Sequence, residues 1–493
     1  MSHPVENTPL QVTRTDIQIR PNNTRVLYRP FEPPTPQRAM KIIGRIMELT
    51  DDVVAAILQA VLAEFHGRHQ RLLNFFEARF EAVKHHLLTD RPLTESQRLV
   101  IGSFFTQEYA LESAALFNPS IVWHPCQDGL PPGTRRFILS LRAVGEGHVS
   151  SVGFRSGTVG PTGKIVVAPP TGFVTAPYVV ANSDYDKSLF LRKLAELGIT
   201  DGFLDLVFDL LEDRFSLAQL EQTLARISRQ QRSRRKEWEP FAAAILALAR
   251  ANYEIDCDPS SDISERVIFP YSPAETNGIE DARFVRFVED DGSVRYFATY
   301  TAFDGNVTLP QIVETQDFVR FQLSTLNGPE IANKGMALFP RRINGSYAML
   351  SRQDGENIYL MESDMLHFWH SKTLVLRPTH SWEFVQIGNC GSPIETPHGW
   401  LVLTHGVGPM RKYSIGAVLL DLDDPSKLIG RLPLPMLSPN ENERAGYVPN
   451  VVYSCGSILH EGTLVIPYSM SDYATSFATV PLAELLDAMR VTA

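Results

Sequence analysis

The segment Asp281 to Phe303, DARFVRFVEDDGSVRYFATYTAF, decides the fold class of this chain. Two short runs rich in phenylalanine, tyrosine and valine stand on either side of a polar turn that contains glycine, which is typical of β-strands. Similar runs continue toward the C-terminal end: RVIFPYS (266–272), GSYAMLSRQ (345–353), NIYLMES (357–363), GWLVLTHGV (399–407), SIGAVLLDL (414–422) and TLVIPYSMSD (463–472). Turn signals separate these runs, so we predict a mainly β chain.

Helical patterns precede and interrupt the strands. Residues 1–35 are polar and proline-rich, and apolar residues then recur at i, i+3, i+4 spacing from Ile42 to Phe65, which predicts amphipathic helices. Thr94, with Gln97 three residues later, resembles a capping box. The sequence therefore predicts an N-terminal arm and helical region at 1–114. A β domain follows at 115–493, with a helical insertion at about 187–250.

The strand region favours one architecture. Many short strands without crossover helices indicate a sandwich, a barrel or a propeller. A propeller is favoured because the region is long and each unit ends in a polar or aromatic turn. The loops of propeller blades meet at a central channel, so charged residues are expected at strand ends that lie far apart in the sequence.

Composition limits the classes of function. The formal net charge of -10 argues against a nucleic-acid partner, because phosphate backbones require a basic surface. No stretch reaches the roughly 18 apolar residues of a membrane span, and the N-terminal sequence lacks the apolar core of a signal peptide, so we expect a cytoplasmic location. The cysteines Cys126, Cys257, Cys390 and Cys455 show no CxxC pairing, so we expect buried thiols and no zinc site.

Polar residues do stand where the strands end. Glu280 and Asp281 are adjacent, with Arg283 just after them, and neighbouring side chains on a strand or tight turn point in different directions. We therefore expect one carboxylate to act and the other to hold something in place. Further residues at strand edges are Asp304, Lys334, Arg352, His405, Tyr413 and Asp472. Each alone is read more readily as a salt bridge or turn cap, but the set is more informative.

Several linked segments resemble one known family. They are NKGMALFPRRINGSYAMLSR (333–352), IGNCGSPIETPHGWLVLTHGV (387–407), IGAVLLDLDDPSKLIGRLPLPMLSP (415–439) and VPNVVYSCG (448–456). In addition, GIEDARF (278–284) resembles a Glu-Asp-Pro-Arg signature, and FNPSIVWHP (117–125) and LSLRAVGEGH (139–148) resemble sugar-binding segments. In this order they resemble glycoside hydrolase family 130, over about residues 115–180 and 265–493. That resemblance implies a five-bladed propeller acting on β-mannosides, as a phosphorylase or, in some members, a hydrolase.

The resemblance also implies a role for each matching residue. Asp281 is the implied general acid, acting on the glycosidic oxygen through the 3-hydroxyl of the bound mannose, because a leaving alkoxide is too basic to depart unprotonated. Glu280 and Arg283 are implied positioning groups. Asn118 and Arg142 are implied on the sugar side, with Asp304 and Asp472 as hydroxyl acceptors. The implied phosphate pocket consists of Lys334, Arg352, His405 and Tyr413.

These four residues favour phosphorolysis. Phosphate carries nearly two negative charges and needs cationic or donor groups, whereas an attacking water needs a carboxylate base. We expect an inverting β-mannoside phosphorylase that releases α-mannose 1-phosphate, with phosphate as co-substrate and no metal or organic cofactor. Three positions depart from the strongest pattern. Ala282 replaces the usual proline, Gln386 stands where a lysine is often found, and Lys334 lacks the bidentate fork of arginine.

Two other functions stay open. On the same scaffold, a β-mannosidase would use Glu362 or Glu395 as the base for water. A mannoside-binding protein without turnover would account for the added helices. We also expect a homo-oligomer, because propellers of the family often associate and the helical region adds surface.

Overall fold

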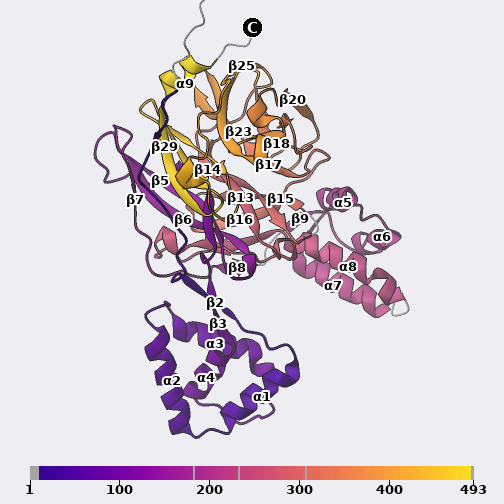
Figure 1. Ribbon diagram of the computed structural model, residues 1–493. Helices are drawn as coiled ribbons and strands as arrows, with labels where there is room; N and C mark the ends of the chain where they lie inside the picture. Colours follow the sequence, from indigo (N-terminus) through magenta and orange to yellow (C-terminus); the bar gives the residue numbers. More distant parts are fainter. Residues whose placement is uncertain (1–9, 181–183, 231–233, 306–307, 490–493) are drawn as a thin grey trace, which may run out of the picture.

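Antiparallel sheets dominate the structure. The computed structural model describes residues 10–180, 184–230, 234–305 and 308–489 (Figure 1). Within these residues, five sheets have four to six strands each, and two further sheets have two strands. The prediction of a mainly β chain is confirmed.

The central strands of the five large sheets follow one another along the chain, whereas β12 and β1 join their sheets from other parts of the sequence. The first contains β4 (Ala115–Trp123), β5 (Arg135–Val144), β6 (Ser150–Val159), β7 (Ile165–Val167) and β12 (Val267–Ile268). The second contains β8 (Tyr178–Val180), β11 (Tyr253–Asp256), β13 (Ile279–Val288), β14 (Val294–Phe303), β15 (Thr308–Thr315) and β16 (Arg320–Thr325). The third contains β17 (Lys334–Leu338), β18 (Tyr347–Arg352), β19 (Ile358–Ser363) and β20 (Lys372–Leu376). The fourth contains β21 (Gln386–Asn389), β22 (Ile394–Thr396), β23 (Gly399–Val407), β24 (Tyr413–Leu420) and β25 (Leu428–Arg431). The fifth contains β1 (Thr13–Arg14), β26 (Val452–Tyr453), β27 (Ile458–His460), β28 (Thr463–Met470) and β29 (Ala474–Pro481).

Each large sheet contacts the next. Strand β4 contacts β13, β14 contacts β17, and β17 and β18 contact β21. Strand β24 then contacts β26, and β28 of the fifth sheet returns to β4 of the first. The N-terminal β1 pairs with β29, so the first and last strands of the described residues share one sheet. The contacts between sheets therefore close a cycle.

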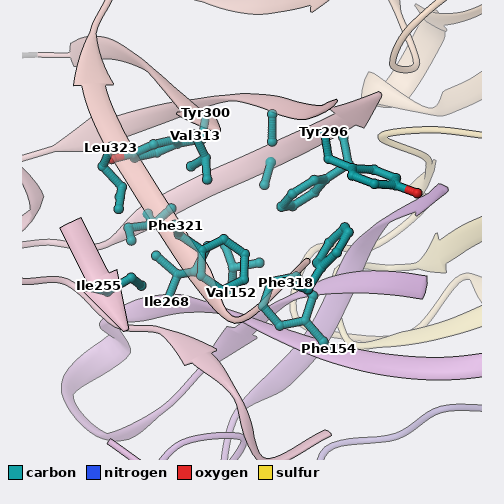
Figure 2. Close-up of a cluster of buried hydrophobic side chains, with 14 of the residues drawn as sticks. Val152, Phe154, Ile255, Ile268, Tyr296, Tyr300, Val313, Phe318, Phe321 and Leu323 are labelled. Carbon is teal, nitrogen blue, oxygen red and sulfur yellow. The ribbon is translucent and has the colours of Figure 1, made fainter. Parts of the chain in front are cut away.

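Aromatic side chains fill the space between the first two sheets. Phe154 on β6 stacks on Phe321 of β16, with ring centroids 5.7 Å apart, and Phe318 packs edge-on against both (Figure 2). All three side chains are buried. At roughly 1.5 to 3 kcal/mol for burying such a side chain, this cluster is a main stabilising contact between neighbouring sheets.

Helices form two groups outside the sheets (Figure 1). The N-terminal group contains α1 (Pro36–Met47), α2 (Asp51–Phe65), α3 (Leu72–Val83) and α4 (Glu95–Phe104). The second contains α5 (Lys187–Glu196), α6 (Gly202–Phe208), α7 (Leu217–Gln230) and α8 (Arg235–Arg250), with the strand pair β9 (Asp184–Asp186) and β10 (Arg214–Ser216). A last helix, α9 (Leu482–Ala488), follows β29. The capping box predicted at Thr94 and Gln97 is confirmed at the start of α4.

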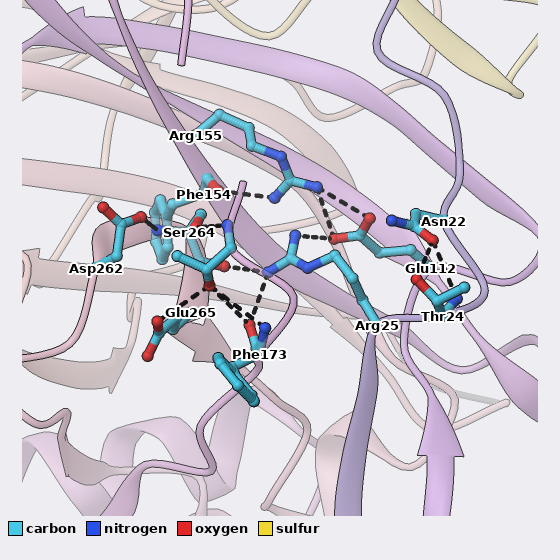
Figure 3. A network of polar contacts seen from close by, with 11 residues as sticks. Asn22, Thr24, Arg25, Glu112, Phe154, Arg155, Phe173, Asp262, Ser264 and Glu265 are labelled. Carbon is cyan, nitrogen blue, oxygen red and sulfur yellow. Dashed lines mark hydrogen bonds and ion pairs between the residues drawn. The ribbon is translucent and has the colours of Figure 1, made fainter. Parts of the chain in front are cut away.

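A buried charge network joins the N-terminal segment to the first sheet. Arg25 lies just before β2 (Val26–Pro30), which pairs with β3 (Thr106–Ala110) at the base of the helices. Glu112 bridges Arg25 at 2.8 Å and Arg155 of β6 at 2.8 Å, and Arg25 also donates to the carbonyl of Ser264 (Figure 3). Because removing one partner of a buried pair leaves an uncompensated charge, this network fixes how the arm enters the sheets.

The burial of the four cysteines differs in part from the sequence expectation. Cys257, Cys390 and Cys455 are buried free thiols, but the expectation of a buried Cys126 is wrong, because it lies exposed in the turn after β4. Its amide donates to the ring of His124, and short polar turns of this kind stay at the surface.

Among the described residues, no helix combines the length and the apolar composition that a membrane crossing requires.

Candidate active site

Backbone bulges bring the predicted site residues together. Asn118 and Asp281 both have positive φ, 48° and 54°, and each lies at a break in the strand register, between Phe117 and Ser120 on β4 and between Glu280 and Arg283 on β13. A third break follows Lys334 on β17, where Gly335 has φ 93°. A bulge redirects the side chain of the extra residue, so the start of each strand presents a polar group away from the regular pleat.

Glu280 and Asp281 share one arginine. Arg142 on β5 lies 2.9 Å from Glu280 and 3.4 Å from Asp281. Asn118 donates its amide to Asp281 at 2.6 Å, and Lys334 pairs with Glu280 at 3.2 Å. Glu280 therefore bridges two cations that come from different sheets, while within the described residues the side-chain contacts of Asp281 all reach its Oδ1 atom. This arrangement fits the expectation that one carboxylate holds and the other is available to act.

Two carboxyl groups of the site have pKa values that move in opposite directions. Burial alone would raise the pKa of Asp281, but the charges of Arg142, Arg283 and Lys334 and the Asn118 amide outweigh it, so the pKa lies below its usual value. For Asp472, burial and the negative charge of Asp281 raise the pKa to about 7, against the opposing charge of Arg142. One carboxyl is thus anionic and the other is partly protonated at neutral pH.

A second group of residues surrounds Arg352, which has no carboxylate partner among the described residues. Arg352 is 9% exposed, and its Nη1 atom lies 3.3 Å from Nε2 of His405. Burial and the charges of Arg352 and Arg283 lower the pKa of His405 well below its usual value, so the ring is neutral and its Nε2 accepts from Arg352. Tyr413 stacks on His405, with ring centroids 6.0 Å apart. Lys334 is the cross-strand neighbour of Arg352.

Tyr453 is a site residue that the sequence reasoning missed. Its hydroxyl accepts from Arg283 Nη2 at 2.7 Å, and its ring packs against His405 with centroids 4.9 Å apart. Arg283 is 3% exposed, and its other bond goes to the backbone carbonyl of Asp281 at 3.2 Å. Tyr453 belongs to the segment VPNVVYSCG, so the family resemblance was the signal that could have identified it. Tyr453 therefore connects the residues around Glu280 and Asp281 with Arg352 and His405.

The structure brings most of the predicted site together. Bonds, ring contacts or charge effects connect Asn118, Arg142, Glu280, Asp281, Arg283, Lys334, Arg352, His405, Tyr413 and Asp472. Asp304 directly follows β14, whose Thr301 pairs with Glu280, so its backbone lies at the same end of the second sheet. Within the described residues, no group of three histidine, cysteine or acidic side chains is arranged to hold a metal ion.

Comparisons with known proteins show which proteins this chain resembles. A family model described as beta-1,4-mannooligosaccharide phosphorylase matches residues 248–491. A 1,2-beta-oligomannan phosphorylase from Thermoanaerobacter sp. (strain X514) is 36% identical over 256 residues, which cover 50% of this chain and 83% of that protein. A beta-1,2-mannobiose phosphorylase from the same organism is 34% identical, covering 42% of this chain and 68% of that protein. The solved complex of beta-1,2-mannobiose phosphorylase from Listeria innocua with beta-1,2-mannobiose is 20% identical, covers 77% of this chain and 92% of that chain, and has a TM-score of 0.45.

This chain belongs to glycoside hydrolase family 130. The family recognised from the sequence motifs is therefore confirmed.

Proposed function

We propose that the chain is an inverting β-mannoside phosphorylase. Inorganic phosphate attacks C1 of a terminal β-mannosyl residue, the bond from C1 to the glycosidic oxygen breaks, and a bond from C1 to a phosphate oxygen forms on the opposite face. The leaving oxygen receives a proton that originates on Asp281 and passes through the 3-hydroxyl of the mannose. The products are α-mannose 1-phosphate and a sugar shortened by one residue. The names of the related phosphorylases support this assignment.

One observation carries the choice of phosphate as nucleophile. Arg352 is buried and contacts a neutral His405, and buried Arg283 contacts a phenol and a backbone carbonyl. Burying an unpaired charge is costly, and the cost is recovered when an anion binds beside it. Lys334, with 41% of its side chain exposed, stands at the open side of the same group. Together with Tyr413, these residues are the proposed binding site for a phosphate dianion, which arginine holds through charge-assisted hydrogen bonds.

Phosphate binding also explains how Asp281 becomes an acid. Its pKa is lowered by nearby positive charges, so the carboxyl is ionised in the free site. A dianion beside Lys334 and Arg283 offsets these charges and raises the pKa of Asp281 toward the range in which it holds a proton. Binding of phosphate therefore favours the protonated form of Asp281, so the nucleophile and the acid are both in place when phosphate and sugar are bound.

On the sugar side, hydroxyl groups meet a mixed set of donors and acceptors. Arg142 and Asn118 hold Asp281 and leave donor hydrogens for sugar oxygens. Within the described residues, the Asp472 carboxyl has no hydrogen-bond partner, so a sugar hydroxyl is a suitable one. We assign Asp304 the same role on the basis of its place after β14. Glu280 positions Arg142 and Lys334.

Hydrolysis is the less favoured reaction because both candidate bases stand away from the site. Glu362 pairs across the strands with Ala348, four residues before Arg352 on β18, which corresponds to about 13 Å. Glu395 opposes Trp400 on β23, five residues before His405, or about 17 Å, and is paired with Arg341 at 2.7 Å. Neither can place a water on the face opposite Asp281.

We infer that the five large sheets are the blades of a five-bladed propeller. The cycle of contacts between successive sheets and the pairing of β1 with β29 support this, because closing the ring with the first strand removes open sheet edges. The catalytic domain is then 115–493, with 187–250 as its insertion, and 1–114 is the arm and helical region. Four free cysteines fit a reducing compartment such as the cytoplasm.

We also infer that the chain forms a homo-oligomer through its N-terminal helices. Helix α2 has two polar residues after Asp52, Gln59 and Glu64, yet Val54 is its one fully buried residue. Val53 is 44% exposed. A helix that is apolar on most sides is normally covered, and a second copy would cover it. Light scattering should find a multimer that Val53→Glu dissociates; a monomeric wild-type protein would contradict this.

The deciding experiment supplies β-1,2-mannobiose and β-1,4-mannosyl-glucose with and without phosphate, and measures mannose 1-phosphate and mannose separately. We expect mannose 1-phosphate that requires phosphate, and a loss of about a thousandfold in Asp281→Asn with the fold intact. The exposed Asp90→Asn is the matched control. Free mannose formed at equal rates in both buffers would identify a hydrolase, and sugar binding without either product a binding protein.

A further inference from the structure

Two exposed rings stand beside the proposed active site without a role in it. Tyr447, which is 57% exposed, precedes β26, and His148 is exposed in the loop between β5 and β6. Their ring centroids lie 5.8 Å apart with an interplanar angle of 32°. They come from the fifth and the first sheet, the two sheets that also supply Asp472 and Arg142.

The backbone holds His148 in place. Gly147 and His148 have φ values of 68° and 60°, and the Gly145 amide donates to the Val149 carbonyl at 3.1 Å, which closes the loop. The hydroxyl of buried Tyr109 lies 3.1 Å from the carbonyl of Glu146 and supports the loop from below. A tight loop of this kind loses little freedom when a ligand contacts it.

Backbone contacts hold the segment that contains Tyr447 against the loop that carries Asp472. The amide of Val448 donates to the carbonyl of Ser471 at 3.0 Å, directly before Asp472. A side chain at Gly446 would lie 2.4 Å from that same carbonyl, so the segment packs closely on the loop between β28 and β29. On the first sheet, His148 is six residues beyond Arg142, or at most about 20 Å of extended chain. The ring pair therefore borders the sugar side of the site.

Exposed aromatic side chains that are held rigidly beside a proposed sugar-binding site can contact another sugar residue of the substrate. An apolar sugar face stacks on an aromatic ring, and a hydroxyl can bond to the imidazole or the phenol. Because the proposed reaction removes a terminal residue, the substrate extends from the cleaved bond only toward the leaving sugar, so a further sugar residue bound at the ring pair lies beyond that bond.

We propose that Tyr447 and His148 form a subsite for a sugar residue beyond the leaving sugar, and that this subsite favours β-mannosides of three or more residues over disaccharides. The proposal rests on the proposed function, because it assigns the direction of the substrate from the place of Asp281. It adds a specificity determinant to the reaction.

Kinetics on a matched pair of substrates tests the subsite. Phosphorolysis of the mannosyl disaccharide and trisaccharide of one linkage is measured for wild type, Tyr447→Ala, His148→Ala and Tyr447→Phe. We expect Tyr447→Ala to raise KM for the trisaccharide about tenfold and to leave KM for the disaccharide and for phosphate within about twofold. Tyr447→Phe should keep the trisaccharide preference, because the ring supplies the contact. The control is Tyr178→Ala on β8, which removes a ring that is 67% exposed elsewhere.

Equal changes for both substrates, or no change for either, would overturn the subsite. A changed oligomeric state in Tyr447→Ala with unchanged KM values would assign the rings to a contact between copies instead. If wild type turns over no mannoside, the proposed function fails, and calorimetry still tests the subsite. Tighter binding of the trisaccharide than the disaccharide, lost in Tyr447→Ala, supports it, and equal binding of the two refutes it.

Discussion

The guanidinium of Arg352 lies 3.3 Å from Nε2 of His405, and within the described residues no carboxylate pairs with it. A neutral imidazole can orient the arginine but cannot balance its charge. The free protein therefore carries a buried cation that an anion would stabilise. The site therefore has two halves. In one half, cations contact the carboxylates Glu280 and Asp281. In the other half, Arg352 has no carboxylate partner among the described residues.

The first prediction concerns stability with and without phosphate. We expect Arg352→Met to unfold at the same temperature as wild type or higher in phosphate-free buffer, because the substitution removes an unpaired buried charge. Phosphate should raise the melting temperature of wild type by binding linkage and leave the variant unmoved. Differential scanning fluorimetry over a phosphate titration measures both. Arg226→Met, on an exposed turn of α7, is the control; a variant that phosphate still stabilises would contradict the assignment of Arg352.

The second prediction uses a glycine that touches the histidine. A Cβ atom at Gly388 would lie 2.3 Å from Cε1 of His405. Because Gly388 is in strand β21 with no positive φ, an alanine fits its backbone and acts through the clash alone. We expect Gly388→Ala to displace the ring and the arginine it orients, and to lower kcat/KM for phosphate about a hundredfold. Gly153→Ala on β6, where nothing lies within 4 Å, should be neutral. An active Gly388→Ala would show that the position of His405 is unimportant.

Much of the site was predictable because motif residues stand at strand ends, but their convergence depends on backbone geometry. Sequence periodicity places Glu280 and Asp281 on opposite faces of a strand. The bulge between Glu280 and Arg283, with Asp281 at φ 54°, lets one arginine reach both. The usual proline is absent at Ala282, and the bulge forms without it. Aspartate adopts positive φ more often than most other non-glycine residues, but this preference does not locate a bulge, so pattern reasoning could not supply this detail.

The missed and misjudged residues have a common physical cause. Tyr453 looks like an ordinary strand residue, and its role comes from an arginine 170 residues away in the sequence. For His405, the neutral state of the ring, in which Nε2 accepts from Arg352, comes from burial and from two arginines that lie far away in the sequence. The strand pattern itself, by contrast, is local, since alternation and turn residues act within one hairpin, and the mainly β class followed from it directly.

The third prediction restores a cation to the pocket. Gln386 begins β21 two residues before Gly388, so its side chain lies on the face of the strand that meets His405. Gln386→Lys should place an ammonium beside the phosphate pocket and lower KM for phosphate about tenfold, with kcat for saturated sugar little changed. Gln222→Lys on the exposed side of α7 adds the same charge elsewhere. An unchanged KM for phosphate in Gln386→Lys would show that this strand end does not face the nucleophile.

The last prediction follows from Asp472, whose pKa is raised to about 7. A carboxyl with a folded-state pKa above its unfolded value of about 3.9 favours folding while it is protonated, and this contribution is lost as the pH rises from about 4 to about 7. Asp472→Asn does not titrate, so its free energy of unfolding should exceed that of wild type by an amount that grows over this window and is level above about pH 8. Between pH 5 and pH 8 we expect the difference to increase by roughly 2 kcal/mol, measured by urea denaturation. Activity should fall in the same variant, because the amide is a weaker acceptor for a sugar hydroxyl than a carboxylate. A difference in stability that stays constant from pH 5 to pH 8 would mean that Asp472 is ionised over this whole range. The charge of Arg142 would then outweigh burial and the charge of Asp281 in setting the pKa of Asp472.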